Sequence, residues 1–533
     1  MQRTRDEAER PPGTITAMTP FTIACCQVRA HDIDDAEANL AQILEALDEA
    51  GRAGAQLVLL PECAYPAYYL KDDKPYDRPG VRPYAEVCRL FGERAKRYGF
   101  WLAAGMAVPH EDGALTNSGV VFGPDGEVRG RYDKSFLWHF DTVWFAKGRE
   151  YPVFDAGFAK FGVLICADGR QPEVARMLRI NGAEVICDLT AWVSWARTPE
   201  TLSTTQCEYL MPVRAYENGV WVAAADKWGP EDGSIVYAGR SCVIDPDGVT
   251  RVAAPSTGNA VVTYRVEPSF AELRPRRPAL YGTLRQEYET LPAATFEREA
   301  LVPSAAVGRV AISPGPRDWA PAEVARRYRA LRTQDADIVI FPGMTGLDGW
   351  QVDLPEIEAA VRELGGVAVV PVRTTGCNLK ESIAIVMPER TVEHVVTHGR
   401  GIDLGETPAV VIATAAGNLG VVGGDEGLVP EVARCLALNG ADVIAWSLFE
   451  PDGMAERVAR CRADENRVYV AAAWPGGGLI ANPDGGVMTA VPEGLDVAMT
   501  AGVSRAMSRW KEKAPGTHVF RDRTPEAYGP LTR

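Results

Sequence analysis

Three strand-like runs in the first half of the chain each end in a chemically unusual residue. Glu62 follows QLVLLP, Lys134 follows GEVRGRYD, and Cys166 follows FGVLI. Catalytic side chains often gather where the strands of a sheet meet loops. The pattern therefore predicts one site in which a carboxylate, an ammonium group and a thiol come together.

This set of groups suits nucleophilic catalysis by the thiol. A cysteine attacks a carbonyl only as thiolate, so it needs a base, and Glu62 can serve if removal from water raises its proton affinity. Lys134 would favour the thiolate and then stabilise the tetrahedral oxyanion. Taken singly, the three have plainer interpretations as a solvated strand end, a surface lysine and a buried free cysteine. A histidine base is less favoured, because His139 sits in no recognisable partner motif.

The sequence also contains an internal repeat. The segment FGVLICADGRQPEVARMLRINGAEVI, residues 161–186, reappears without a gap as LGVVGGDEGLVPEVARCLALNGADVI, residues 419–444. Two further pairs match in the same order, namely 53–62 with 335–343 and 276–285 with 523–533. Self-similarity of this kind indicates duplicated structural units. We therefore predict an N-terminal extension over 1–20, a first domain over 21–290, a linker over 291–305 and a second domain over 306–533.

Within each predicted domain, apolar β-rich runs alternate with amphipathic stretches of helix length. Residues 34–54 are predicted as a helix because Leu40, Ile43, Leu44 and Leu47 fall on one face. Alternation of this kind predicts an α/β fold in which helices cover sheets. The second copy lacks the chemical groups of the first, because alignment places other residues opposite Cys166, Glu62 and Lys134, namely Gly424, Gly343 and, in a looser alignment, His398. We expect no hydrolysis by the second half.

The motifs resemble those of the nitrilase or carbon-nitrogen hydrolase superfamily. The match comprises LPE at 60–62, YDKSFL at 132–137, GVLICADGRQPE at 162–173, RAYENG at 214–219 and SCVIDPDG at 241–248. The resemblance implies an αββα sandwich with a catalytic triad carried onto Glu62, Lys134 and Cys166. Such domains commonly pair back to back, so it also implies two tandem αββα sandwiches packed as an internal pseudo-dimer.

The resemblance suggests roles for neighbouring residues as well. Family members often add a second Glu between the Lys and the Cys, and here only Asp141 lies near that place. We expect the backbone N–H of Ala167 to share the oxyanion with Lys134. The segment CADGRQPE resembles aliphatic amidases and N-carbamoyl amino acid hydrolases more than nitrilases, which favours an amide or carbamoyl substrate.

Four residues are predicted to contact that substrate, namely Ala167, Asp168, Arg170 and Trp192. In the carbamoylase-like branch, Arg170 would receive a substrate carboxylate, and a structural ion pair with Asp168 or Glu173 is the alternative. Trp192 either lines the pocket or belongs to the core. Arg214 and Glu217, one helical turn apart, are predicted to pair behind the site as structural support.

Composition excludes several other classes of protein. The formal net charge of -15 argues against nucleic acid or anionic lipid as a partner. Eleven cysteines without regular spacing and six histidines suggest neither a disulfide framework nor a zinc site, and no cofactor is expected. The first 20 residues lack the apolar core of a signal peptide. We therefore expect a cytoplasmic protein that acts on a small molecule without a membrane, with further homo-oligomer formation left open.

The predicted function is hydrolysis of a non-peptide carbon–nitrogen bond through a thioester on Cys166. Two alternatives remain at this point. In the first, an amine or another acceptor captures the thioester, which would make the protein an acyl transferase. In the second, both copies have lost activity and the chain is a binding or scaffold protein.

Overall fold

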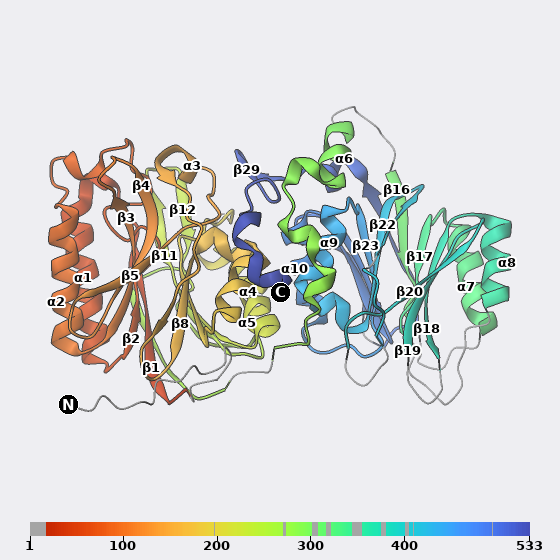
Figure 1. Cartoon of the computed structure of the whole chain (residues 1–533), viewed down its shortest axis with the longest axis horizontal. Helices are drawn as coiled ribbons and strands as arrows, with labels where there is room; N and C mark the ends of the chain where they lie inside the picture. The colour runs from red at the N-terminus through yellow and green to blue at the C-terminus, as the bar shows by residue number, and fades with distance from the viewer. Residues whose placement is uncertain are drawn as a thin grey trace, which may run out of the picture.

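The computed structural model describes residues 18–196, 198–269, 273–300, 307–315, 321–343, 354–374, 380–399, 404–408, 410–492 and 494–533. Most of the predicted N-terminal extension, 1–20, lies outside these ranges. The described residues form an α/β protein with several sheets (Figure 1). No helix among them is long and apolar enough to cross a membrane.

The first half has four layers, with two sheets packed between two pairs of helices. One sheet has the order β12 (Ile235–Ala238), β11 (Lys227–Glu231), β1 (Phe21–Arg29), β2 (Leu57–Leu59), β3 (Trp101–Pro109), β4 (Leu115–Phe122) and β5 (Val128–Asp133), with β15 (Ala260–Val266) beside β1 and β6 (Phe145–Ala146) beside β4. The other has the order β14 (Thr250–Ala253), β13 (Cys242–Ile244), β10 (Trp221–Ala225), β9 (Val185–Leu189), β8 (Lys160–Ile165) and β7 (Val153–Asp155). Helices α1 (Ala36–Arg52) and α2 (Tyr84–Tyr98) cover the first sheet, and α4 (Pro172–Ile180) and α5 (Met211–Asn218) cover the second.

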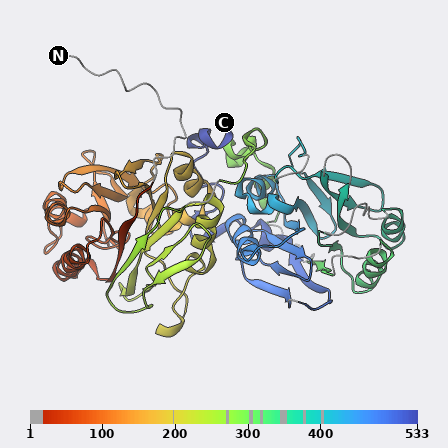
Figure 2. The ribbon, with the colours of Figure 1, turned by 90° about the horizontal axis from the view of Figure 1, so that it is seen from below.

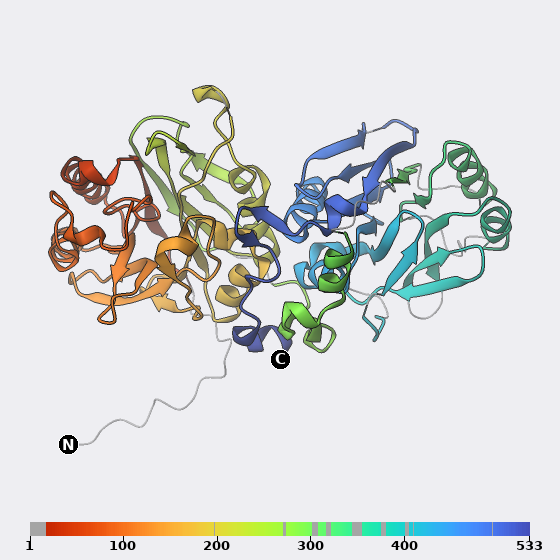
Figure 3. The ribbon, with the colours of Figure 1, turned by 90° about the horizontal axis from the view of Figure 1, so that it is seen from above.

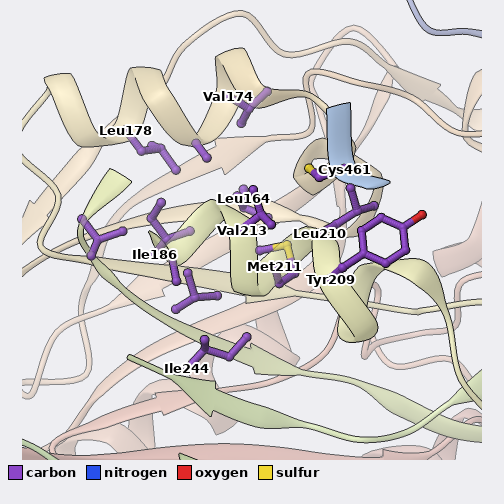
Figure 4. Close-up of a cluster of buried hydrophobic side chains, with 14 of the residues drawn as sticks. Leu164, Val174, Leu178, Ile186, Tyr209, Leu210, Met211, Val213, Ile244 and Cys461 are labelled. Carbon is purple, nitrogen blue, oxygen red and sulfur yellow. The ribbon is translucent and has the colours of Figure 1, made fainter. Parts of the chain in front are cut away.

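The apolar spacing in the sequence explains these layers. The predicted helix over 34–54 is confirmed as α1, in which Leu40, Ile43 and Leu47 are buried at helical spacing. Every residue of β10 is buried, as expected for a strand covered on both faces. Figure 4 shows how α4 and α5 bury Val174, Leu178 and other apolar side chains against Leu164 and Ile186 of the underlying sheet.

The second half repeats this layer order. One sheet has the order β20 (Thr391–Val395), β19 (Lys380–Val386), β18 (Val367–Thr374), β17 (Ile338–Ile340), β16 (Val307–Ile312) and β27 (Met499–Ser504). The other has the order β21 (Val411–Thr414), β22 (Gly417–Gly423), β23 (Val443–Ser447), β24 (Tyr469–Trp474), β25 (Gly477–Ala481) and β26 (Val487–Val491). Helices α7 (Pro321–Arg332) and α8 (Leu354–Leu364) cover the first of these sheets, and α9 (Pro430–Leu438) and α10 (Ala455–Asn466) cover the second.

The two halves pack through their inner helices. Helices α4 and α5 of the first half contact α9 and α10 of the second, while α1 with α2 and α7 with α8 lie at opposite ends of the molecule (Figures 2 and 3). Val174 and Leu178 belong to the same buried apolar cluster as Val432 and Leu436. The halves therefore share one core at their junction and are not independent beads on a linker.

The segment predicted as a linker, 291–305, is partly helical. Helix α6 occupies Pro292–Ala300 and packs against the second half, where it contacts α9. Ala293 and Ala294 are buried, and this burial explains why a segment predicted as a linker forms a helix. Residues 301–305 lie outside the described residues.

Candidate active site

The thiol of Cys166 sits on a tight turn directly after β8. Cys166 has a φ of +47°, a left-handed conformation that is unfavourable for a residue with a side chain. The backbone N–H of Cys166 donates to Asp188 Oδ1 at 2.9 Å, and Gln206 Nε2 donates to the Cys166 carbonyl at 2.7 Å. These two polar side chains hold the turn, and the thiol sulfur lies 3.6 Å from the carbonyl oxygen of Ala191.

Lys134 joins two carboxylates beside this turn. Its Nζ lies 2.5 Å from Glu62 Oε1 and 2.6 Å from Asp141 Oδ2, and all three side chains are at most 1% exposed. Asn117 Nδ2 also donates to Glu62 Oε1 at 2.7 Å. Buried charges are tolerated when they are paired and hydrogen-bonded, as they are here. Asp141, one methylene shorter than the Glu that the resemblance led us to expect, thus still reaches Lys134.

Burial and neighbouring charges set the protonation of this group. Burial raises the pKa of Glu62, and the nearby ammonium of Lys134 only partly opposes this. Burial alone would lower the pKa of Lys134, but the charges of Asp141 and Glu62 outweigh it and the pKa is raised well above its usual value. Burial raises the pKa of the Cys166 thiol, the Glu62 carboxylate raises it further, and Lys134 lowers it. The resting site therefore holds a neutral thiol, a charged lysine and a carboxylate with an enhanced affinity for protons.

Asp168, which was predicted to contact the substrate, has a carboxylate that is hydrogen-bonded within the protein. Its buried carboxylate connects the loop that carries Lys134 to the turn that carries Cys166. It accepts hydrogen bonds at 2.8 to 3.0 Å from the hydroxyls of Tyr132 and Ser135 and from the backbone N–H groups of Phe136 and Ile165. Because both oxygens are occupied, Asp168 has a positioning role in the structure.

Arg170 does not form the ion pair with Asp168 or Glu173 that was the alternative to carboxylate binding. Its guanidinium lies 3.7 Å from Asp464 Oδ1 of the second half and 4.9 Å from the centre of the Trp138 ring. Arg170 thus lies at the junction of the halves, and its acidic neighbour there is Asp464.

Trp192 is fully buried in the core, which favours its interpretation as a core residue over that as a pocket-lining residue. Ala167 directly follows Cys166 and is 1% exposed.

Three polar residues at the site were missed by the sequence reading, namely Asn117, Asp188 and Gln206. Asn117 and Asp188 are completely buried within strands β4 and β9. Asp188 is a charged side chain inside an otherwise apolar strand, which costs free energy unless it has a partner, so it was a usable signal of a site. Asn117 lies between other polar residues of β4 and gave no such signal. Gln206 offered no comparable signal in the sequence.

Among the described residues, no group of three or more His, Cys, Asp and Glu side chains is arranged to hold a metal ion.

The family description "Carbon-nitrogen hydrolase" matches residues 22–275. A nitrilase of Pyrococcus abyssi is 33% identical over 225 residues, which is 42% of this chain and 81% of that protein. The chain belongs to the carbon-nitrogen hydrolase family. A citrullinase of Francisella tularensis is 28% identical over 51% of this chain and 100% of its own length, and an omega-amidase of Homo sapiens is 29% identical over 53% and 100%. The solved structure of an amidase from Nesterenkonia sp. aligns with a TM-score of 0.42 at 24% identity, over 49% of this chain and 95% of that one.

The second half has the same turns with different residues on them. Gly424 has a φ of +48°, nearly that of Cys166, and follows β22 as Cys166 follows β8. The backbone N–H of Glu62 donates to the Thr190 carbonyl, and that of Gly343 donates to the Leu448 carbonyl in the equivalent place. Gly424 and Gly343 thus occupy the positions that the repeat assigned to them.

The looser alignment of His398 with Lys134 is wrong. The backbone N–H of Lys134 donates to the Asn117 carbonyl, and the equivalent bond in the second half runs from Val396 to Glu381. Strand register therefore places Val396, an aliphatic residue, opposite Lys134. The His398 imidazole is 2.7 Å from the Tyr281 hydroxyl.

Arg214 holds the backbone of the turn that carries Cys166. Its Nε donates to the Gly169 carbonyl at 2.9 Å, and its two terminal nitrogens bind Glu217 and Glu465, each at 2.6 Å. The second half mirrors this arrangement. Arg462 Nε donates to the Gly427 carbonyl at 3.0 Å, and its terminal nitrogens bind the same two glutamates at 2.7 and 2.8 Å. The two arginines are therefore matched in burial and partners, but only Arg214 holds a turn that bears a thiol, since the other turn has Gly424.

This mirror pair allows a controlled prediction. Arg214→Lys and Arg462→Lys each keep the charge but lose the planar fork that binds a carbonyl and two carboxylates together. We expect similar falls in thermal midpoint for both variants, because each disturbs the same buried network. We expect kcat to fall by about tenfold only in Arg214→Lys, equivalent to about 1.4 kcal/mol of lost positioning. Equal activity losses in the two variants would show that the network acts through stability alone.

Proposed function

We propose that this chain hydrolyses linear amides or N-carbamoyl compounds through a thioester on Cys166, with its active site in the first half only. The observation that supports this most directly is the Lys134 ammonium, held between the Glu62 and Asp141 carboxylates beside the thiol. The names of the relatives, which include an omega-amidase and a citrullinase, favour substrates of this class over a peptide.

In the first step, the Cys166 sulfur attacks the substrate carbonyl while the thiol proton passes to Glu62. Because burial raises the pKa of Glu62, the carboxylate is a stronger base than one in water. The carbonyl π electrons move to oxygen, and the Lys134 ammonium and the Ala167 N–H stabilise the resulting oxyanion. When the tetrahedral intermediate collapses, the C–N bond breaks and Glu62 gives its proton to the departing ammonia or amine.

In the second step, water cleaves the thioester. Glu62 takes a proton from the water as its oxygen attacks the acyl carbon, and the same two donors stabilise the second oxyanion. Collapse breaks the C–S bond, releases the acid, and returns a proton to the sulfur. Asp141 acts through Lys134, since its carboxylate lies 2.6 Å from the ammonium and fixes its position.

The second half is proposed to be a degenerate copy of the first, retained as an internal partner. The order β5-β4-β3-β2-β1-β15 corresponds to β20-β19-β18-β17-β16-β27, and β14-β13-β10-β9-β8-β7 corresponds to β26-β25-β24-β23-β22-β21, while among the described residues β6, β11 and β12 belong to the first half alone. The crossed ion pairs between Arg214, Glu217, Arg462 and Glu465 are those expected of a two-fold related interface. Gly343, Val396 and Gly424 leave this copy without a base, an ammonium or a nucleophile at the corresponding positions.

Mass spectrometry of the intact protein tests the proposed function. The enzyme would be mixed with a panel of small amides and N-carbamoyl compounds and quenched in acid during turnover. We expect a mass increase equal to the acyl group, located by peptide mapping to Cys166. Cys207→Ser is the matched control, because Cys207 is a half-buried free thiol outside the site, and this variant should still form the adduct. No adduct with any compound, together with no ammonia release, would favour a non-catalytic protein, while transfer of the acyl group to an added amine would favour acyl transfer.

A further inference from the structure

The second half carries a C-terminal segment without an equivalent in the first half. Between β15 and the matched segment 276–285, the first half has only residues 267–275. Between β27 and the matched segment 523–533, the second half has residues 505–522, which include α11 (Arg505–Arg509), β28 (Glu512–Ala514) and β29 (Thr517–His518). Figure 1 shows this β28–β29 hairpin at the junction of the halves, near α3 (Asp141–Trp144) of the first half.

The hairpin contacts the active-site loop at a strained residue. The backbone N–H of His139 donates to Thr517 Oγ1 at 2.8 Å. His139 has a φ of +46°, which is unfavourable for a residue with a Cβ atom. It lies in a tight turn closed by two hydrogen bonds of 2.8 Å, one from the Trp138 N–H to Asp141 Oδ2 and one from the Asp141 N–H to the Trp138 carbonyl. The same Asp141 oxygen binds the ammonium of Lys134.

The second half also anchors the hairpin itself. Lys513 Nζ lies 2.7 Å from Asp464 Oδ1, and Lys511 Nζ donates to the Arg467 carbonyl at 2.8 Å. Asp464 in turn lies 3.7 Å from Arg170, whose guanidinium covers the Trp138 ring. The turn before Asp141 is therefore held from two sides by residues of the second half.

We infer that Thr517 is a positioning residue for the active site of the other half, through the chain of contacts Thr517, His139, Asp141 and Lys134. This inference rests on the proposed function. Without the Thr517 hydroxyl, the His139 turn relaxes towards an ordinary conformation, and the Asp141 carboxylate no longer fixes the ammonium where the oxyanion forms. Such a loss affects the transition state more than substrate binding. It also gives the degenerate copy a role beyond structural pairing, because its extra segment completes the active site.

Thr517→Val tests this directly, since it removes the hydroxyl and keeps the shape. We expect kcat to fall by about fivefold to tenfold with little change in KM, the usual effect of losing one hydrogen bond that positions a catalytic group. Thr517→Ser keeps the hydroxyl and should have a kcat close to that of the wild type. Thr414→Val is the matched control, because the Thr414 hydroxyl donates to the Gly417 carbonyl within the second half only. In the Thr517→Val background, His139→Gly should return part of the lost kcat, since glycine adopts the left-handed turn without strain.

The rate at which iodoacetamide alkylates Cys166 gives a second measure that needs no substrate. Lys134 lowers the pKa of the thiol, so a displaced ammonium should slow alkylation in Thr517→Val but not in Thr414→Val. The inference is overturned if Thr517→Val keeps both the wild-type kcat and the wild-type alkylation rate, or if Thr414→Val causes equal losses. If the wild type hydrolyses no compound but the alkylation rates differ as expected, the proposed function fails and the positioning contact stands.

Discussion

Cys166→Ala should abolish turnover, with kcat/KM for the best amide substrate falling on the order of 10⁵-fold or more, as is typical when a catalytic nucleophile is removed. The reason is that no other side chain at this site is placed to form the acyl intermediate. Glu62 is tied to Lys134 and Asn117, and the second half has Gly424 at the corresponding turn. Release of ammonia or amine, followed over time with purified enzyme, measures the effect.

A folding defect must be separated from the loss of chemistry. The Cys166 side chain is small and alanine tolerates the same backbone turn about as well, so the thermal midpoint should shift by no more than a few degrees, equivalent to about 1 kcal/mol. Cys187→Ala is the control for a folding defect. Cys187 is completely buried in β9, so its replacement creates a small cavity, but its thiol has no part in the proposed mechanism. Substantial residual turnover by Cys166→Ala would contradict the assignment of the nucleophile.

The sequence was sufficient where local pattern decides structure. The spacing of Leu40, Ile43 and Leu47 predicted α1, and the apolar runs before Glu62 and Cys166 predicted strands that end at the site. Side chains that interact with their own strand or helix leave a periodic trace in the sequence. The pairing of Arg214 with Glu217, three residues apart on α5, was predictable for the same reason and is confirmed at 2.6 Å.

Where remote segments supply the partner, the sequence was not sufficient. Asp168 was expected to face the substrate, but Tyr132 and Ser135, which lie far from it in the chain, occupy its carboxylate. The acidic neighbour of Arg170, Asp464, comes from the other half altogether. Nothing in a local motif indicates which distant side chain will fill a hydrogen-bonding position. The alignment of His398 failed because strand register, which places Val396 opposite Lys134, is fixed by backbone hydrogen bonds between strands.

Glu62→Gln should have two opposite effects at the same site. Turnover should fall on the order of 10³-fold or more, because the amide cannot accept the thiol proton or activate water. The thiol itself should become more acidic. Burial raises the pKa of Cys166, the negative charge of Glu62 raises it further, and Lys134 lowers it. Replacing the carboxylate with a neutral amide removes the second contribution and leaves the third, so the thiolate should form at a lower pH than in the wild type.

The rate of Cys166 alkylation by iodoacetamide, measured from roughly pH 6 to 10 around the ordinary pKa of a thiol, reports this change. In Glu62→Gln, the rise in rate should move to lower pH, so that the inactive variant reacts faster than the wild type near neutrality. Asn117→Ala is a useful comparison, because it removes a neutral hydrogen-bond donor to Glu62 and leaves the carboxylate charged. A general disturbance of the site would lower turnover and leave alkylation slower or unchanged. Only a charged carboxylate next to the thiol predicts a variant with lower turnover and a larger thiolate fraction, so this pair of measurements distinguishes a direct effect of the Glu62 charge on Cys166 from a general disturbance of the site.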